Sequence, residues 1–433
     1  VFLMDTRLWH ASDTNKSNIR RTSLVVRYAP WWLNLEVFRP GSYDRKKIIE
    51  DKNKFGSLYP SVTKNAFDKR ILLDMDAKKK SKLMRSMASK LREYKDEGAS
   101  ILSSENGKTI EQCKGEFLGA ANTYDYYAGL TDKIENKMIP SGADTFNYVV
   151  LEPFGVTLQI VPWNYPLLLM AWKAAPALAA GNALVIKPSE YTPLSIMRWL
   201  EVACDHLPTG VVNMITGDGV TGAHLVEHPG TRVIAFTGSV DTGKKIAMMA
   251  AKQLKKTSLE LGGNDPIIIC DDADIKIAAR GTTWGGLLNA GQVCTSLERV
   301  FVMDNIADDF IDAVVEEAKK VRLGDPMNGK TDMGPMSSLN ALNKVENKVK
   351  RAKKEGARLL TGGSKPAGFK KGYFYQPTVF DKIESHMEMM NIETFGPIIP
   401  IQKVKSFEEA INLSNDSQSV SYTHLTLPTI LLV

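Results

Sequence analysis

The runs VTLQIV (156–161), ALVI (183–186), VVNMI (211–215) and RVIAF (232–236) decide the fold of this chain. All four are short and apolar, and helical patterns separate them along the sequence. Repeated alternation of strand and helix requires crossover connections, so the strands are predicted to be parallel and covered by helices on both faces. The stretch from about 140 to 260 therefore predicts a doubly wound α/β sheet.

Further elements extend this pattern in both directions. A helix is predicted from Asp76, because apolar residues recur at positions 83, 87, 91 and 94 and so share one face. A second helix is predicted over about 109–129. A second α/β unit begins near Leu259 and continues past Pro400, with a buried strand predicted at Pro266–Cys270.

The composition is that of a globular protein with more than one domain. The 433 residues suit two or three domains, and 43% hydrophobic with 24% charged residues excludes a disordered or collagen-like chain. No apolar run reaches the roughly eighteen residues of a membrane span, so none is predicted. The 55 basic and 49 acidic residues are interspersed, which predicts a solvated surface and no nucleic-acid partner.

The four cysteines, at positions 113, 204, 270 and 294, have spacings that fit neither a disulfide framework nor a zinc ribbon. We therefore expect reduced thiols. The N-terminal residues lack the apolar core of a secretory signal. Both observations predict a cytoplasmic protein.

Ligands of a doubly wound sheet bind beyond the carboxyl ends of its strands, so the loops there are candidate sites. The loop FTGSVDTG (236–243) precedes a helix predicted from Lys244 to Leu254, and Gly238 and Gly243 allow the backbone to approach a phosphate. A simple strand-to-helix turn is the alternative. The loop lacks the Lys-Ser/Thr ending of a P-loop, which disfavours ATP.

The loop KPSE (187–190) ends another strand of the same predicted sheet. Lys187 and Glu190 suit hydrogen bonds to ribose hydroxyls, and the carboxylate would repel a 2′-phosphate. A surface turn is the alternative on local sequence alone.

Cys294 differs from the other cysteines in its neighbours. It lies in NAGQVCT (289–295), whose glycine and polar residues favour an exposed turn. A thiolate is the strongest side-chain nucleophile near neutral pH, so Cys294 is the candidate nucleophile. Cys113, Cys204 and Cys270 are expected to be small core residues.

Two further polar residues suit catalysis. Glu260 in LELGG (259–263) is a carboxylate between two leucines, and apolar neighbours suit a carboxylate to act as a general base. A strand glutamate that faces solvent is an equally supported alternative on local sequence. Asn164 in PWNYP (162–166) follows a strand and is fixed by flanking prolines, so its amide is suited to donate to an oxyanion. A turn asparagine without a catalytic role is the alternative there.

The stretch HLVEH (224–228) matches the H-x-x-E-H pattern of certain zinc peptidases. Against a zinc site, Pro229 and Gly230 end the helix at once, and the segment lies in a crossover of the sheet. No metal is expected, and a zinc hydrolase at His224 and His228 is kept as an alternative.

The order and spacing of these motifs resemble the aldehyde dehydrogenase superfamily. The matching motifs are PWNYP (162–166), KPSE (187–190), FTGS (236–239) with Gly243, LELGG (259–263), GQVC (291–294) and ETFGP (393–397). Chance agreement in all six is negligible, and the similarity covers about residues 66–420. PWNYPLLLMAWK and GQVCTS are similar to betaine-aldehyde and lactaldehyde types.

The resemblance implies a reaction. The Cys294 thiolate would attack an aldehyde carbonyl, and the Asn164 amide with the Cys294 N–H would hold the alkoxide. Hydride would pass from this thiohemiacetal to NAD, and Glu260 would activate the water that hydrolyses the thioester to a carboxylic acid. An aldehyde oxidoreductase is expected, with an aldehyde as its small-molecule substrate.

The resemblance also implies a cofactor site. Lys187 and Glu190 would contact the adenosine ribose and favour NAD over NADP. Ser239 would contact the diphosphate in a turn shaped by Gly238 and Gly243. The contacts around the nicotinamide would come from Trp163, which lines the site, Glu393 at the ribose and Phe395 at the ring.

The fold implied is α/β in three parts. These are a Rossmann-like cofactor-binding domain (66–136 and 153–258), an α/β catalytic domain (259–420) and a small β arm (137–152) that joins subunits into a homodimer or homotetramer. Residues 1–65 stay unassigned, with a non-native origin as one interpretation. The family pattern stops after Asp416, and 421–433 is interpreted as a non-native tail. Such a truncation leaves a catalytically silent member of the fold as a second alternative.

Overall fold

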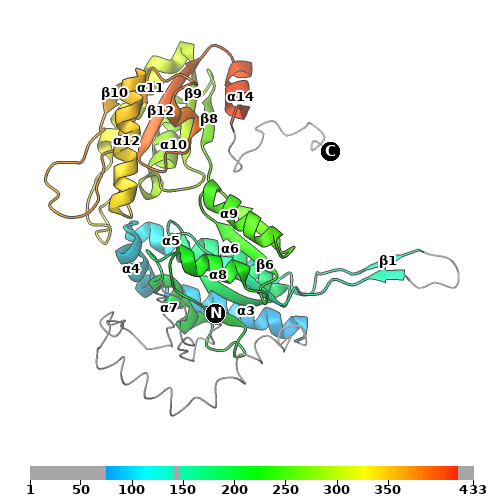
Figure 1. Cartoon of the computed structure of the whole chain (residues 1–433). Coiled ribbons are helices and arrows are strands. Elements are labelled where there is room, and N and C mark those ends of the chain that lie inside the picture. The colour runs from blue at the N-terminus through cyan, green and yellow to red at the C-terminus, as the bar shows by residue number, and fades with distance from the viewer. Residues whose placement is uncertain (1–74, 141–146, 418–433) are drawn as a thin grey trace, which may run out of the picture. The chain divides into compact units, whose positions relative to one another are not determined.

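The computed structural model describes residues 75–140 and 147–417 (Figure 1). The segments 1–65 and 421–433, which the sequence left unassigned or marked as non-native, lie outside the described residues. The chain divides into two compact units. Of the described residues, unit 1 takes 75–98, 114–140, 147–237 and 241–259, and unit 2 takes 99–113, 238–240 and 260–417.

The sheet of unit 1 has the predicted doubly wound topology. Its strand order is β5-β4-β3-β6-β7, with strands Val212–Met214 (β5), Ala183–Lys187 (β4), Val156–Ile160 (β3), Val233–Thr237 (β6) and Lys256–Glu260 (β7). β3 pairs in parallel with both β4 and β6, and β4 pairs in parallel with β5. The four predicted strands are confirmed, and the order reverses beside β3, where such sheets open to ligands.

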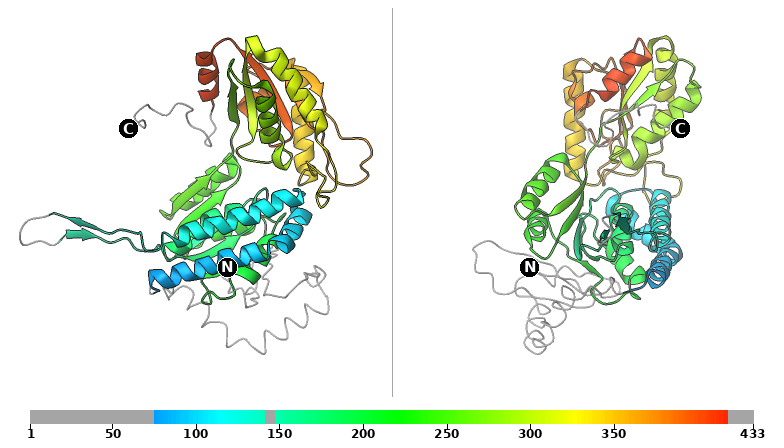
Figure 2. Two further views of the ribbon diagram at one scale, coloured as in Figure 1. Left: turned by 180° about the vertical axis from the view of Figure 1, so that it is seen from behind. Right: turned by 90° about the vertical axis from the view of Figure 1, so that its right-hand side faces the viewer.

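Helices cover both faces of this sheet (Figure 2). On one face α3, α6 and α7 pack together, and α8 and α9 lie over the other. The helices are α3 (Ala77–Glu93), α4 (Lys95–Asn106), α5 (Ile110–Ala128), α6 (Pro166–Ala179), α7 (Leu194–Ala203), α8 (Gly219–Glu227) and α9 (Val240–Ala251). The predicted helices near 76 and over 109–129 are confirmed as α3 and α5.

Local sequence explains where α3 begins and which face it buries. The Asp76 carboxylate accepts a hydrogen bond from the Lys79 N–H at 2.8 Å and so caps the first turn. Met87 and Leu91, two of the residues on the predicted face, are fully buried. The apolar spacing therefore positions α3 against its neighbours, as the sequence predicted.

Unit 2 is the second α/β unit that the sequence predicted. Its sheet has the order β10-β11-β12-β9-β8, and only β10 is antiparallel to its neighbour among the described pairs. The strands are β8 (Asp265–Ile269), β9 (Leu297–Met303), β10 (Arg358–Thr361), β11 (Thr378–Asp381) and β12 (Ile398–Val404). The helices are α10 (Ile275–Leu287), α11 (Ala307–Lys320), α12 (Leu339–Glu355), α13 (Glu388–Asn391) and α14 (Phe407–Asn415).

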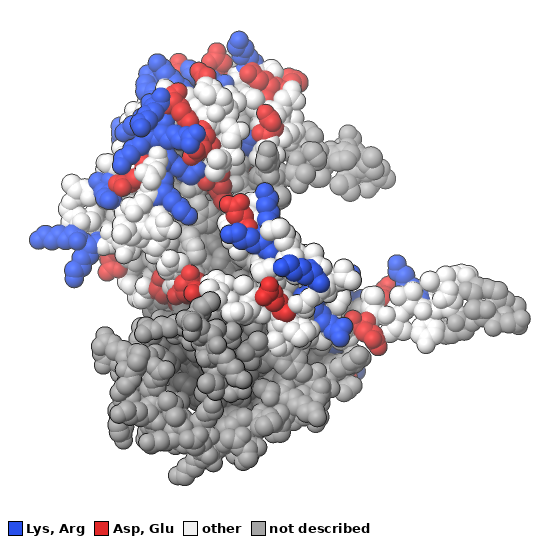
Figure 3. Space-filling model, viewed as in Figure 1, with Lys and Arg blue, Asp and Glu red and all other residues white. Residues whose placement is uncertain are grey.

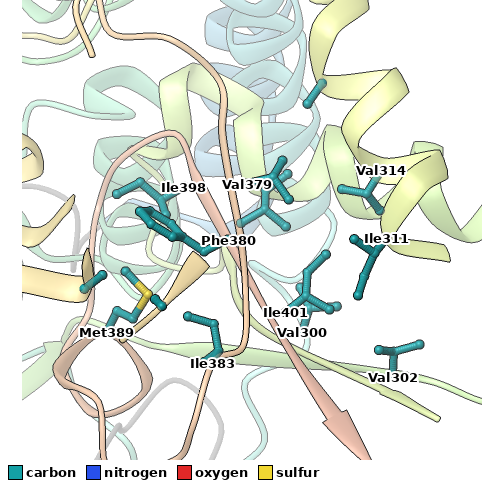
Figure 4. Packing of buried hydrophobic residues seen from close by; sticks show 14 of the residues in the cluster. Val300, Val302, Ile311, Val314, Val379, Phe380, Ile383, Met389, Ile398 and Ile401 are labelled. Carbon is teal, nitrogen blue, oxygen red and sulfur yellow. The ribbon is translucent and has the colours of Figure 1, made fainter. Parts of the chain in front are cut away.

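The core of unit 2 forms between this sheet and its helices (Figure 4). Val300 and Val302 of β9, Phe380 of β11 and Ile401 of β12 are all fully buried. Val314 of α11 belongs to the same cluster. Because β9 lies at the centre of this core, the residues just before it and within it are held rigidly.

A two-stranded antiparallel ribbon, β1 (Lys137–Ile139) with β2 (Asn147–Val149), projects from unit 1 (Figures 1 and 2). Its apolar side chains are exposed, with Met138 at 70% and Tyr148 at 58%. The predicted arm at 137–152 coincides with this ribbon.

The surface charge is mixed in sign (Figure 3). Lys and Arg side chains gather over α12, and Asp and Glu side chains lie among them. Among the described residues, no helix combines the length and the apolar character needed to cross a membrane.

The core of unit 2 gives a test of the fold. Phe380→Ala removes a fully buried ring and should lower the free energy of unfolding by about 3–5 kcal/mol. Phe407→Ala is the matched control, because that ring is 49% exposed and its loss should cost less than about 1 kcal/mol. Urea denaturation followed by tryptophan fluorescence measures both variants. Equal effects of the two changes would contradict the packing described for β11.

Candidate active site

Cys294 follows a turn with an uncommon backbone. After α10 ends at Leu287, the residues Asn289, Ala290 and Gly291 have φ of 51°, 55° and 72°. Three successive left-handed residues are unfavourable for side chains with a Cβ, so surrounding contacts must hold this turn. The predicted turn is present, and its shape is that of a constrained loop.

Gln292 supplies those contacts. Its side chain is fully buried, and its Nε2 donates to the Asn289 carbonyl at 2.9 Å. Its Oε1 accepts from the Ser337 N–H at 3.0 Å, while the Asn289 amide donates back to the Gln292 carbonyl at 3.3 Å. These bonds fix the backbone two residues before Cys294.

A close backbone approach joins this turn to the ETFGP loop (393–397). A Cβ placed on Gly291 would lie 2.0 Å from the Gly396 carbonyl oxygen, so only glycine fits there. The approach brings the Cys294 turn and the ETFGP loop together within unit 2. Two motifs that lie about a hundred residues apart in sequence therefore form one structure.

The Cys294 thiol is partly buried in an acidic environment. Burial raises the pKa of Cys294, and the negative charges of Glu393, Asp265 and Glu260 raise it further. The thiol is therefore protonated near neutral pH, and its use as a nucleophile requires a base that removes the proton. This is a correction to the expectation of an exposed thiolate.

Glu260 ends β7 with an exposed side chain. Its backbone carbonyl accepts from the Gly238 N–H at 3.1 Å, which ties the strand end to the glycine of the FTGS motif. An exposed carboxylate on a fixed strand end is able to reach water, and it lies within electrostatic range of Cys294.

Glu393 is the second carboxylate of this group. Its Oε1 accepts from the Gly263 N–H at 3.0 Å, and a Cβ on Gly262 would lie 2.4 Å from its Oε2. The paired glycines of LELGG thus make room for the carboxylate. Burial raises the pKa of Glu393 to about 7, while the Gly263 N–H and the charge of Lys348 oppose the shift.

Asn164 lies in unit 1, between β3 and α6, and only 4% of it is exposed. The first turn of α6 is capped by Glu116, whose Oε1 accepts from the Leu167 and Leu168 N–H groups at 2.9 and 3.0 Å. That cap holds the PWNYP segment at the carboxyl end of β3. Trp163, beside Asn164, is partly buried.

Lys187 and Glu190 lie at the carboxyl end of β4. The Lys187 Nζ donates to the Pro188 carbonyl at 2.8 Å, and a Cβ on Gly222 would contact its methylene chain at 3.5 Å. Burial lowers the pKa of Lys187, and the charges of Glu190 and Asp218 oppose that shift. The Lys187 ammonium group therefore lies at the carboxyl end of β4, where the sequence predicted it.

The FTGS segment differs from the prediction in its helix. The helix expected from Lys244 begins at Val240, so Gly243 is a buried residue of the first turn of α9 instead of a loop residue. A glycine before a helix and a glycine inside its first turn look alike in sequence, so the start of the helix was predicted at the wrong residue. Gly238 and Ser239 remain in the turn before the helix, where Ser239 is exposed.

Unit 2 therefore brings together Cys294, Glu260, Glu393 and Phe395, while unit 1 holds Asn164, Trp163, Lys187 and Glu190. Sequence reasoning missed four residues of this region: Glu116, Asp265, Gln292 and Glu298. Burial raises the pKa of Asp265 to about 7. Asp265, a charged residue at the start of the apolar strand β8, left an available signal, whereas Glu116, Gln292 and Glu298 left none.

The expectation for the other cysteines needs correction in part. Cys113 is buried as expected, but Cys204 and Cys270 are only partly buried. At the HLVEH stretch, α8 ends at Glu227 and the Nδ1 of His228 accepts from the Gly230 N–H at 3.1 Å. Within the described ranges, no group of three or more His, Cys, Asp or Glu side chains is arranged to hold a metal ion.

Comparisons with known proteins agree with this arrangement. Residues 61–421 match the model of the aldehyde dehydrogenase family. The chain is 39% identical to aminoaldehyde dehydrogenase 1 of Pisum sativum, over 78% of this chain and 68% of that protein. It is also 39% identical to betaine aldehyde dehydrogenase of Bacillus subtilis, over 82% of this chain and 74% of that protein.

A solved structure shows the same fold. Betaine aldehyde dehydrogenase from Staphylococcus aureus, in complex with NAD+, matches with a TM-score of 0.80 and 39% identity, over 82% of this chain and 71% of that one. These matches give the zinc-hydrolase alternative no support. The chain belongs to the aldehyde dehydrogenase family and is an enzyme that oxidises an aldehyde.

Proposed function

We propose that this enzyme oxidises its aldehyde to a carboxylic acid with NAD, through a thiohemiacetal and then a thioester on Cys294. One observation supports this most: Cys294 lies on a rigid strained turn within electrostatic range of Glu260 and Glu393. A constrained nucleophile beside a water-accessible carboxylate is the arrangement that acyl transfer through a covalent intermediate needs.

The first step forms the covalent bond. The Cys294 thiol first loses its proton to water, and its raised pKa makes this loss unfavourable near neutral pH. The sulfur then bonds to the aldehyde carbon, and the carbonyl electron pair moves to oxygen. The Asn164 amide and the Cys294 N–H donate to the resulting alkoxide, and one such donor is typically worth about 10²- to 10³-fold in rate.

The second step releases the product. As the carbonyl of the thioester forms, hydride leaves the former aldehyde carbon. Glu260 then removes a proton from water, the hydroxide oxygen bonds to the thioester carbon, and the C–S bond breaks. The carboxylic acid departs, and the sulfur regains a proton.

The donor set fits NAD, which when bound supplies the hydride acceptor. Lys187 and Glu190 at the end of β4 offer an ammonium group and a carboxylate suited to ribose hydroxyls. Gly238 and Ser239 lead into the N-terminus of α9, where Gly243 lies in the first turn and N–H groups suit a diphosphate. Trp163, Glu393 and Phe395 would hold the nicotinamide half. Glu190 disfavours the 2′-phosphate of NADP.

The assembly and location follow as further parts of the proposal. The described parts of 66–136 and 153–258 form the cofactor-binding domain, and those of 259–420 form the catalytic domain. The exposed apolar residues of the arm (137–152) support pairing with a second copy as a homodimer or homotetramer. The four cysteines are free thiols, which supports a cytoplasmic location.

Replacing the nucleophile tests the proposal directly. Cys294→Ser should lower NAD-dependent oxidation of betaine aldehyde and aminoaldehydes by at least about 10³-fold while NAD still binds, because an alcohol is a far weaker nucleophile than a thiolate. Cys270→Ser is the matched control, since that thiol is also partly buried in unit 2. NADH absorbance and calorimetric NAD binding are the measurements. Activity of Cys294→Ser within tenfold of the parent would refute the assignment.

Glu260→Gln separates formation of the thioester from its hydrolysis. The variant should lose about 10²-fold in steady-state turnover, because the amide cannot accept a proton from water during thioester hydrolysis. Acylation and hydride transfer come before the step that Glu260 serves, so a rapid first burst of NADH should precede the slow phase. Glu384→Gln is the control, an exposed carboxylate elsewhere in unit 2. A variant with normal turnover would exclude Glu260 as the base.

A further inference from the structure

Glu298 is a buried carboxylate with defined partners that the proposed reaction does not use. It lies in β9, four residues after Cys294, and only 2% of it is exposed. Its Oε2 accepts from the Thr394 N–H and its Oε1 from the Phe395 N–H, both at 2.6 Å. One carboxylate therefore holds two successive backbone N–H groups of the ETFGP loop.

The loop needs such support because of its backbone. Phe395 has a φ of 54°, a left-handed conformation that is unfavourable for an aromatic residue. Glu298 stabilises this conformation, because its two oxygens accept from two successive N–H groups of the loop. The same loop carries Glu393 immediately before the two bonded N–H groups.

A second side chain holds the other end of the loop. Lys348 of α12 donates from its Nζ to the Ile392 carbonyl at 3.2 Å. Lys348 also lies 3.8 Å from the carboxylate of Glu388, which itself pairs with Arg351. The backbone on both sides of Glu393 is thus held by side chains from two different elements.

The charges around Glu298 show why the bonds matter. Burial and the negative charge of Glu393 raise the pKa of Glu298 to about 8, whereas the two loop N–H groups and Lys348 lower it. Arg299, the next residue in β9, also interacts with the Glu298 charge. The loop N–H groups are therefore the polar groups that compensate the buried carboxylate, and each partner depends on the other.

We propose that Glu298 and Lys348 are positioning residues for the NAD-dependent step, which hold residues 392–397 so that the Glu393 carboxylate and the Phe395 ring are fixed for the nicotinamide half of the cofactor. This inference rests on the proposed function. Neither residue touches the reacting sulfur. Their loss should affect hydride transfer and NAD binding far more than the chemistry of Cys294 and Glu260.

An assay that needs no cofactor separates these effects. With p-nitrophenyl acetate, the Cys294 sulfur bonds to the acetyl carbon, p-nitrophenolate leaves, and water activated by Glu260 hydrolyses the acetyl thioester. Glu298→Gln keeps the side-chain volume but turns an amide N–H₂ toward one of the loop N–H donors. We expect kcat/KM for NAD to fall at least tenfold, and NAD-free ester hydrolysis to stay within twofold of the parent.

Two further variants make the test decisive. Glu346→Gln is the matched control, a partly buried carboxylate of the same helix as Lys348 that pairs with Lys365, and both of its activities should stay within twofold. Lys348→Met removes the hydrogen bond to the Ile392 carbonyl. It should lower kcat/KM for NAD more than ester hydrolysis, as in Glu298→Gln, but by a smaller factor. If Glu298→Gln fails to fold, the two activities of Lys348→Met test the inference in its place.

Two results would overturn the inference. Parallel loss of both activities in Glu298→Gln or Lys348→Met would indicate a general structural role, and unchanged NAD-dependent activity would show that the loop needs no such support. A parent enzyme without either activity would instead refute the proposed function, so the two failures are distinguishable.

Discussion

The close approach of the Cys294 turn to the ETFGP loop is the constraint on which the site depends. At Gly291 the two backbones come so near that a Cβ would overlap the Gly396 carbonyl. The turn is left-handed over three residues, so it cannot relax to a regular conformation without separating from that loop. The candidate nucleophile Cys294 and the Glu393 carboxylate are therefore placed by one shared contact.

This packing places several carboxyl groups close together in a region that is largely buried from water. Asp265, Glu298 and Glu393 all have a raised pKa, and burial is the largest cause for each. The same environment keeps the Cys294 thiol protonated until a base acts on it. A resting thiol is oxidised less readily than a resting thiolate.

The fold and the principal motif residues could be predicted because they leave local signals. Strands such as 156–160 are apolar runs between turns, and Cys294 stands in a glycine-rich turn. Glu298 left no such signal, because its role comes from a hydrogen bond to residues about a hundred positions later. The predicted start of α9 was wrong at Gly243, because a glycine before a helix and a buried glycine in its first turn look alike in sequence.

The proposed reaction depends on an acyl group that is bound to Cys294 during turnover. The direct measurement is peptide mass spectrometry of the Glu260→Gln enzyme, acid-quenched while it oxidises an aldehyde with NAD. We expect one acyl group per chain, carried by the peptide that contains Cys294 and absent from those of Cys113, Cys204 and Cys270. An enzyme that turns over without any acyl adduct, or with the adduct on another cysteine, would contradict it.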